Sequence, residues 1–170
     1  MMTSDKLSTA YISLGSNIDP EVNLKRAIEL IKTRCTVLAV SHAYRTPPQG
    51  FTNQADFLNL ALKIETDLDV VTLKHSVLDW IERELKRVRD PNNKNAPRTI
   101  DLDISLWNND IFDYGEKSWH IPDPDILRFA HVALPLAEIA PDYIHPIEKT
   151  SLNVIAARFI QTHFEKVELI

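Results

Sequence analysis

Two aspartates separated by one residue, Asp101 and Asp103, stand out in the segment PRTIDLDISLW, residues 97–107. Apolar residues fill every second position, which predicts a strand with one buried face: Ile100, Leu102, Ile104 and Leu106. Side chains two positions apart on a strand share a face, so the two carboxylates point together, away from the apolar residues. Two neighbouring carboxylates repel each other, and strands are depleted in Asp. The pair therefore indicates a cation site, unless the strand is a half-exposed edge with two solvated aspartates.

Residues near the pair favour magnesium and phosphate as its ligands. Magnesium is usually bound by one or two carboxylates and completed by water and substrate phosphates. Arg87, Arg89 and Arg98 precede the pair, and guanidinium groups donate paired hydrogen bonds to phosphate. Lys86, Arg87 and Arg89 are equally explained as the solvated end of a helix that interacts with the helix dipole. Glu82 faces either this cleft or solvent. With 3 glycines in the chain, no glycine-rich phosphate loop is available, so side chains and metal would hold the phosphates.

Composition sets limits on the class of protein. The chain has 170 residues, 44% of them hydrophobic, which suits one domain with a proper core. Its formal net charge of -5 argues against a general nucleic-acid binder. No apolar run of about 18 residues and no apolar signal segment can be read, so we expect a cytoplasmic protein without a membrane partner. The single cysteine, Cys35, can form no internal disulfide.

Periodicity and turn residues predict an α+β fold. Strands are expected at residues 8–14, 36–44, 57–65 and in the Asp-bearing segment, and a short strand at 111–112 is expected to pair with that segment. Helices are expected from Pro20 after an Asp19 cap, at 69–88, as short pieces within 121–141, and at 152–164. The order β-α-β-β-α-β predicts a ferredoxin-like α/β sandwich, an antiparallel sheet with helices on both sides, in one domain spanning 1–170.

Several segments together resemble a known family, the 6-hydroxymethyl-7,8-dihydropterin pyrophosphokinases of folate biosynthesis. The resemblance covers nearly the whole chain and follows the order of the family. It rests on YISLGSN, YRTPPQG, DFLN, RVR, PRTIDLDI and ALPLAEIAP. The combination of the YRTPPxG and RTIDLDI motifs is highly specific, whereas neither motif alone would be as strong.

The resemblance implies an ATP-dependent diphosphotransferase. It would transfer a pyrophosphoryl group from ATP to the hydroxymethyl oxygen of the pterin and release AMP. The family pattern implies that Asp101 and Asp103 hold two Mg²⁺ ions, and that Arg87 and Arg98 act with them in catalysis. Contacts to ATP are implied for Glu82, Arg87, Arg89, Arg98 and Ile104. The expected partners are these small molecules alone, and a monomer is expected.

The resemblance also implies a pterin pocket, formed by Gly15, Thr46, Pro47, Gln49, Phe57, Asn59 and His131. Residues 46–49 would offer backbone groups to the polar edge of the pterin, and the Asn59 amide offers both a donor and an acceptor. Phe57 would stack on one face of the ring. His131 stands where the family commonly has a second aromatic residue. If the resemblance is set aside, Phe57 and His131 are expected to be core residues, and Asn59 is expected to be a solvated strand residue.

Three further positions depart from the family pattern. Asp123 replaces a frequent histidine in an IPHP motif, and Phe129 stands at an arginine position. Asn95 replaces a tryptophan that is sometimes found before the Pro-Arg pair. These departures leave two alternatives open, a diverged paralogue acting on another pterin alcohol and a non-catalytic pterin- or nucleotide-binding module. Retention of the aspartate pair with Arg87 and Arg98 weighs against the module.

Overall fold

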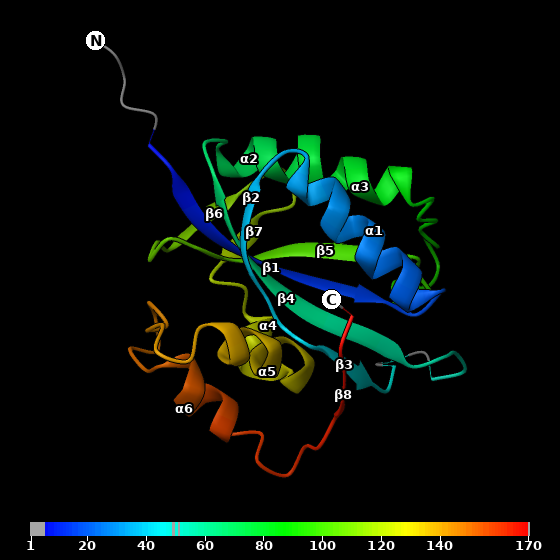
Figure 1. The fold of residues 1–170 in the computed structure, drawn as a ribbon. Helices are drawn as coiled ribbons and strands as arrows, with labels where there is room; N and C mark the ends of the chain where they lie inside the picture. Colours follow the sequence, from blue (N-terminus) through cyan, green and yellow to red (C-terminus); the bar gives the residue numbers. More distant parts are fainter. Residues whose placement is uncertain (1–5, 49, 51, 170) are drawn as a thin grey trace.

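An antiparallel sheet of six strands forms the centre of the computed structural model, which describes residues 6–48, 50 and 52–169 (Figure 1). The strand order is β5-β1-β4-β3-β8, β2 also pairs with β4, and every pairing is antiparallel. The strands are β1 (Ser8–Ser16), β2 (Thr36–Val40), β3 (Ala43–Thr46), β4 (Phe57–Thr66), β5 (Asp101–Trp107) and β8 (Glu165–Val167). The Asp-bearing strand, β5, is therefore an edge of the sheet.

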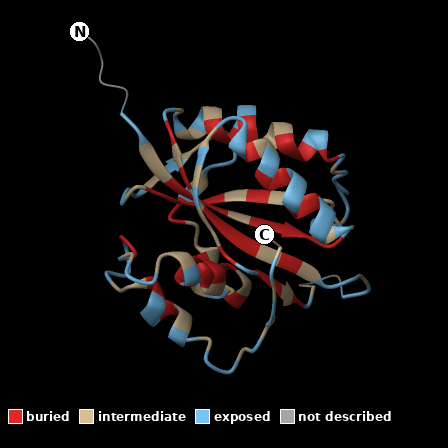
Figure 2. Cartoon of the chain, viewed as in Figure 1, coloured by how far each residue is buried: buried red, intermediate tan, exposed pale blue. Residues whose placement is uncertain are grey.

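Helices cover both faces of this sheet (Figure 1). One face carries α1 (Pro20–Lys32) and a continuous helical segment made of α2 (Val70–Thr72), the π-helical turn η1 (Leu73–Leu78) and α3 (Asp79–Glu84). The other carries α4 (Asp125–Arg128), α5 (Ala130–Ile139) and α6 (Leu152–Ala157). Buried residues form one cluster in each layer, and Figure 2 shows the buried strands between them. This arrangement confirms the predicted antiparallel α/β sandwich.

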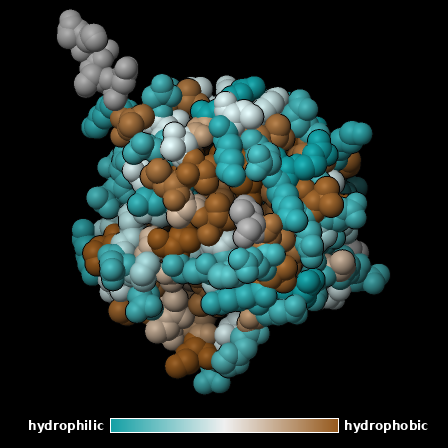
Figure 3. Space-filling model, viewed as in Figure 1, coloured by the Kyte–Doolittle hydropathy of each residue, from teal (hydrophilic) through white to brown (hydrophobic). Residues whose placement is uncertain are grey.

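The distribution of hydrophobic side chains on the surface follows from the alternation of buried and exposed residues in the strands. Figure 3 shows hydrophobic side chains near the middle of one face, over β2, surrounded by hydrophilic ones. Leu38 of β2 is 47% exposed there, while Val37 and Val40 are partly buried against the core. None of the helices in the described ranges has the length and apolarity that crossing a bilayer requires.

A β-bulge interrupts β5 and corrects the predicted alternation. Ile12 pairs with Ile104, but its neighbour Tyr11 pairs with Leu106, so Ser105 has no partner position on β1. Because of the extra residue, side chains after the bulge point to the opposite face of the sheet from the one that the alternation predicts. Leu106 consequently joins the cluster beneath α5, whereas Ile104 remains in the other layer.

One expected pairing and the bounds of one expected strand were wrong. Phe112 belongs to β6 (Phe112–Tyr114), which pairs with β7 (Trp119–Ile121) in a separate two-stranded sheet and not with β5. Asn108 explains the departure, because its amide and its side chain bind the main chain of Thr9 at 2.7 and 2.8 Å and end the ladder there. The expected strand 36–44 is divided into β2 and β3 at Ser41.

Helix ends also differ from the predicted bounds. The helix expected at 69–88 ends at Glu84, and Lys86 then adopts a left-handed conformation with φ 62°. The helix expected at 152–164 ends at Ala157, and the chain returns to the sheet as β8, which the sequence did not reveal. Three residues with one partly buried side chain carry too little alternation to predict a strand.

Candidate active site

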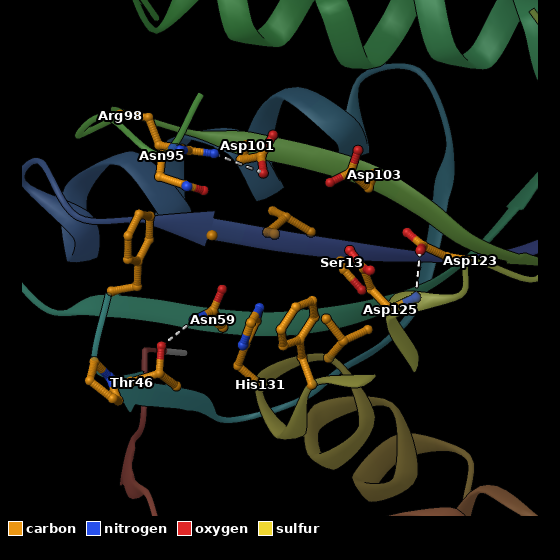
Figure 4. Close-up of a pocket in the computed structure, with 16 residues that line it drawn as sticks. Ser13, Thr46, Asn59, Asn95, Arg98, Asp101, Asp103, Asp123, Asp125 and His131 are labelled. Carbon is orange, nitrogen blue, oxygen red and sulfur yellow. Dashed lines mark hydrogen bonds and ion pairs between the residues drawn. The ribbon is translucent and has the colours of Figure 1, made fainter. Parts of the chain in front are cut away.

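A cavity of about 230 Å³ opens between the sheet and the start of α5. Nine of its lining residues are ones that the sequence pointed to: Gly15, Thr46, Pro47, Phe57, Asn59, Arg98, Asp101, Asp103 and His131. Figure 4 shows the two carboxylates projecting from β5, with Thr46, Asn59 and His131 across the cavity from them. Residues from distant parts of the sequence thus meet in one site.

Asp101 and Asp103 owe their position to the register between β5 and β1. Asp101 pairs with Gly15 and Asp103 with Ser13, while Leu102 between them is fully buried on the other face. Their side chains are 32% and 46% exposed, and both line the cavity. The strand therefore presents two carboxylates to a concave surface while its apolar face anchors it in the core.

Asp101 has strong cationic partners. Its Oδ1 accepts a hydrogen bond from Arg87 Nη1 at 2.8 Å, and its Oδ2 lies 3.5 Å from Arg98 Nη1. Burial acts to raise the pKa of Asp101, but the two guanidinium groups outweigh it and hold the pKa below its usual range. Asp101 is thus kept ionised by arginines.

Asp103 has the opposite surroundings. Burial, followed by the charge of Asp101, raises the pKa of Asp103 to about 8. Lys74 Nζ, at 3.7 Å from Oδ1, opposes that shift, and the carboxylate of Asp123 adds to it. Burial also raises the pKa of Asp123 to about 6. The ionised forms of Asp103 and Asp123 are therefore disfavoured at this end of the cavity, and a bound cation would favour them.

These donors fit magnesium. Two carboxyl groups on one rigid strand supply hard oxygen ligands, and a divalent cation would stabilise the ionised form of Asp103. Within the described ranges, no group of three or more His, Cys, Asp or Glu side chains is arranged to hold a metal ion. An ion here would therefore complete its coordination with water and phosphate oxygens, as magnesium does in phosphoryl-transfer sites.

Glu82 was expected to contact ATP, but it does not line the cavity. It is 5% exposed, and its Oε1 accepts hydrogen bonds from Arg89 at 2.6 Å and from Arg87 at 3.3 Å. Its Oε2 lies 3.4 Å from the amide of Leu102. Burial, and then the charge of Asp101, raises the pKa of Glu82. Glu82 therefore holds Arg87 and Arg89 next to β5.

Three other expected ATP contacts also lie outside the cavity lining. The side chain of Arg87 is 8% exposed, and its Nε is buried with no hydrogen-bond partner in the described part of the chain. Arg89 is 61% exposed, which leaves it accessible beside the site. Ile104 is 3% exposed and belongs to the hydrophobic core, so its side chain is not presented to a ligand. Gln49 lies outside the described residues.

The wall opposite the carboxylates is polar and closely packed. Asn59 Nδ2 donates to Thr46 Oγ1 at 2.6 Å, which fixes the orientation of the amide. A Cβ on Gly15 would lie 2.6 Å from Asn59 Oδ1, so any larger residue here would have to displace this amide. His131 stacks on Phe129 with ring centroids 5.2 Å apart and planes at 24°. Burial lowers the pKa of His131, so its ring is neutral at physiological pH.

A loop before β5 covers one end of the cavity. Arg98 Nη2 donates to the carbonyls of Lys94 and Ala96 at 2.8 and 3.0 Å, and its Cζ lies 5.6 Å from the centroid of the Phe57 ring. Gln54 Nε2 donates to the carbonyl of Asn95 at 2.7 Å. These bonds join the loop to the segment before β4, and they orient Arg98 toward Asp101 (Figure 4).

Sequence reasoning did not assign seven of the lining residues to the site: Ser13, Leu14, Asn95, Asp123, Asp125, Phe129 and Val132. Asp123 and Phe129 were visible as departures from the family pattern. Asp123 is held at the cavity because its amide donates to the carbonyl of Ser105, at the bulge, at 2.9 Å. Ser13 could be found only from its pairing with Asp103. Asn95 was likewise visible as a departure from the family pattern, but it was not assigned to the site.

Comparison with known proteins agrees with the geometry. The family model described as 7,8-dihydro-6-hydroxymethylpterin-pyrophosphokinase (HPPK) matches residues 11–141. The 2-amino-4-hydroxy-6-hydroxymethyldihydropteridine pyrophosphokinase of Bacillus subtilis is 41% identical over 133 residues, which are 76% of this chain and 77% of that protein. The protein of the same name from Methylorubrum extorquens is 35% identical over 95% of this chain and 100% of its own length.

Solved structures share the fold. The wild-type HPPK-DHPS protein of Plasmodium falciparum superposes with a TM-score of 0.74 at 14% identity, covering 92% of this chain and 45% of that one. Its A437G form with SDX-DHP gives a TM-score of 0.75 at 14% identity, covering 93% of this chain and 46% of that one. This chain thus spans less than half the length of those proteins. Since the family model covers most of the chain and the bacterial relatives are similar over most of its length, the chain belongs to the HPPK family.

Proposed function

We propose that this protein transfers a pyrophosphoryl group from ATP to 6-hydroxymethyl-7,8-dihydropterin, a step of folate biosynthesis. The bond between the α- and β-phosphoryl groups breaks and a bond forms between the hydroxymethyl oxygen and the β-phosphorus. AMP leaves, and the hydroxyl proton is released. The observation that carries the proposal is the β5 carboxylate pair, which shares one cavity with Thr46, Asn59 and His131. This shared cavity supports the proposal that a cation and the pterin bind next to each other.

Asp101 and Asp103 are proposed to hold two Mg²⁺ ions. When bound, such ions neutralise charge on the attacking and leaving oxygens and align the displacement. The chain itself supplies Arg98, which lines the cavity, and Arg87, whose buried Nε has an unused donor. Both are proposed to donate to phosphate oxygens, and Arg89 is proposed to join them from its exposed position. Glu82 orients Arg87 and Arg89 for this task.

The opposite wall is proposed to bind the pterin. Asn59, fixed by Thr46, offers a donor and an acceptor to the polar edge of the ring. Phe57 and the neutral ring of His131 are proposed to stack on the two ring faces, with Pro47 and Gly15 closing the edge. Gln49 is proposed to add a contact from the loop. Stacking requires no charge, so a neutral imidazole suits this role.

We also propose that residues 1–170 act as one pyrophosphokinase domain, as a monomer in the cytoplasm. ATP, the proposed donor, is available in the cytoplasm.

Product analysis tests the function directly. Purified protein is incubated with ATP, magnesium and the reduced pterin, and nucleotides are separated by chromatography. We expect AMP to form in amounts equal to the pterin diphosphate. ADP in place of AMP would show transfer of a single phosphoryl group and contradict the proposal. Absence of pterin-dependent ATP consumption, in a sample that binds both substrates, would support a binding module instead.

A further inference from the structure

Lys74 is a charged residue in a hydrophobic position. It is 5% exposed, and its neighbours in η1 are core residues: Leu73, Val77 and Leu78, each no more than 1% exposed. Burial of an ammonium group is costly unless other groups compensate it. The role of Lys74 must therefore be sought in the groups around its Nζ atom.

The contacts of Lys74 all lie at β5 and next to it. Its Nζ donates to the carbonyl of Leu102 at 3.1 Å and lies 3.7 Å from Asp103 Oδ1. It also lies 5.1 Å from the ring centroid of Trp119. In the described part of the chain, Lys74 is the only side chain in an ion pair with Asp103, whereas Asp101 has both Arg87 and Arg98. Asp103, which has fewer cationic partners than Asp101, is thus paired with the ammonium group of Lys74.

The π-helical turn contributes to this placement. Lys74 and Glu82 lie eight positions apart, yet Lys74 binds the carbonyl of Leu102 and Glu82 faces its amide. In a regular α-helix, residues at this spacing point about 80° apart. The wider turn of Leu73–Leu78 rotates the chain less per residue, which brings the two side chains to the same residue of β5.

We propose that Lys74 is a positioning residue that lowers the affinity of the nucleotide-free enzyme for divalent cations. Its ammonium group lies next to the Asp103 carboxylate and repels a divalent cation that would bind the same carboxylate. Cations then bind well only when the phosphates of the nucleotide supply further ligands and charge. This inference rests on the proposed function, in which the β5 carboxylates hold magnesium.

Calorimetric titration of Mg²⁺ into nucleotide-free enzyme tests this role. Lys74→Met keeps the length and packing of the side chain but removes the charge, and Lys74→Gln keeps a donor for the Leu102 carbonyl. We expect both to tighten Mg²⁺ binding about tenfold, because each removes a unit positive charge beside the bound ion. Lys74→Arg should bind Mg²⁺ like the parent. Lys166→Met is the matched control. Lys166 belongs to β8, at the opposite edge of the sheet, and its Nζ lies 5.6 Å from the centroid of the Tyr44 ring.

The outcomes separate this inference from the function on which it rests. Unchanged Mg²⁺ affinity in Lys74→Met and Lys74→Gln, both folded by circular dichroism, would overturn the role of Lys74. A change in Lys74→Met alone would also overturn it, because packing and not charge would then be responsible. The proposed metal site fails separately if Asp103→Asn leaves Mg²⁺ binding intact in the presence of a non-hydrolysable ATP analogue.

Discussion

Asp101 and Asp103 lie two positions apart on one strand but have opposite electrostatic surroundings. Arginines hold the pKa of Asp101 low, whereas burial and its neighbour raise the pKa of Asp103. A carboxyl whose pKa is raised by folding is more easily ionised in the unfolded chain. Its contribution to stability is therefore full below the unfolded pKa and is lost as pH rises toward the folded value of about 8. Without a cation, Asp103 destabilises the protein at neutral pH.

Asp103→Asn should separate stability from activity. The substitution keeps size and removes the charge, so we expect the melting temperature of the metal-free protein to rise at neutral pH. Turnover should fall by about 10²-fold or more, because a cation ligand is lost. Calorimetry and an AMP-release assay measure the two effects, with Asp142→Asn on the exposed surface as control. Activity within about twofold of the parent at saturating magnesium would remove Asp103 from the metal site.

His131→Phe tests the stacking wall. The new ring can keep the contact with Phe129, now 5.2 Å between centroids, and offers a larger apolar face to the pterin. Stacking contributes about 1 kcal/mol, so we expect the pterin to bind several-fold more tightly. The measurement is calorimetric titration with 6-hydroxymethyl-dihydropterin, magnesium and a non-hydrolysable ATP analogue. Equal affinity in parent and variant would show that His131 does not touch the ring.

The approach of β1 to β4 sets the shape of the pterin wall. Gly15 pairs with Asn59, and a Cβ at Gly15 would lie 2.6 Å from Asn59 Oδ1. Gly15→Ala must displace the Asn59 amide, which breaks its bond to Thr46 or withdraws it from the cavity. We expect pterin affinity to fall about tenfold, equivalent to one hydrogen bond, with little change in ATP-analogue binding. Parallel titrations with both ligands check this, and an equal loss for both would indicate general misfolding.

Local patterning explains which elements were predictable. The period of two in β5 depends only on neighbouring residues, so the shared face of Asp101 and Asp103 followed from the sequence. The bulge at Ser105 depends on how β5 pairs with β1, about ninety positions away, and no local signal announces it. Lys74 was not predicted to be buried, because a lysine in a surface helix ordinarily faces solvent. Its partners on β5 became visible only in three dimensions.

At the scale of the whole molecule, Glu138 joins the two layers away from the active site. From α5 it accepts hydrogen bonds from the Tyr44 hydroxyl at 2.6 Å and from the His42 amide at 2.9 Å. Burial acts to raise the pKa of Glu138, but these bonds outweigh it and lower the pKa from 4.5. Its stabilising effect is therefore complete above pH 4.5 and is lost as pH falls through the lowered pKa.

Glu138→Gln should reduce stability in a pH-dependent way. We expect the free energy of unfolding at neutral pH to fall by about 1 kcal/mol, less than for a fully buried charged hydrogen bond because the contact is partly open to solvent. The difference from the parent should vanish in acid, below pH 4.5. Urea unfolding across this pH range measures it, with Glu116→Gln as a surface control. A constant difference at all pH values would assign the effect to packing.

The exposed edge of the sheet has a consequence for aggregation. An edge strand offers unpaired amides and carbonyls on which another chain can add a strand. Three such groups on β5 and just before it are bonded by side chains: the Ile100 carbonyl by Arg87, the Leu102 carbonyl by Lys74 and the Leu102 amide by Glu82. The charged side chains of Arg87, Lys74 and Glu82, which surround the active-site carboxylates, thereby also hinder edge-to-edge association. Chains that lose these contacts would be open to strand addition at the very strand that carries the active-site carboxylates.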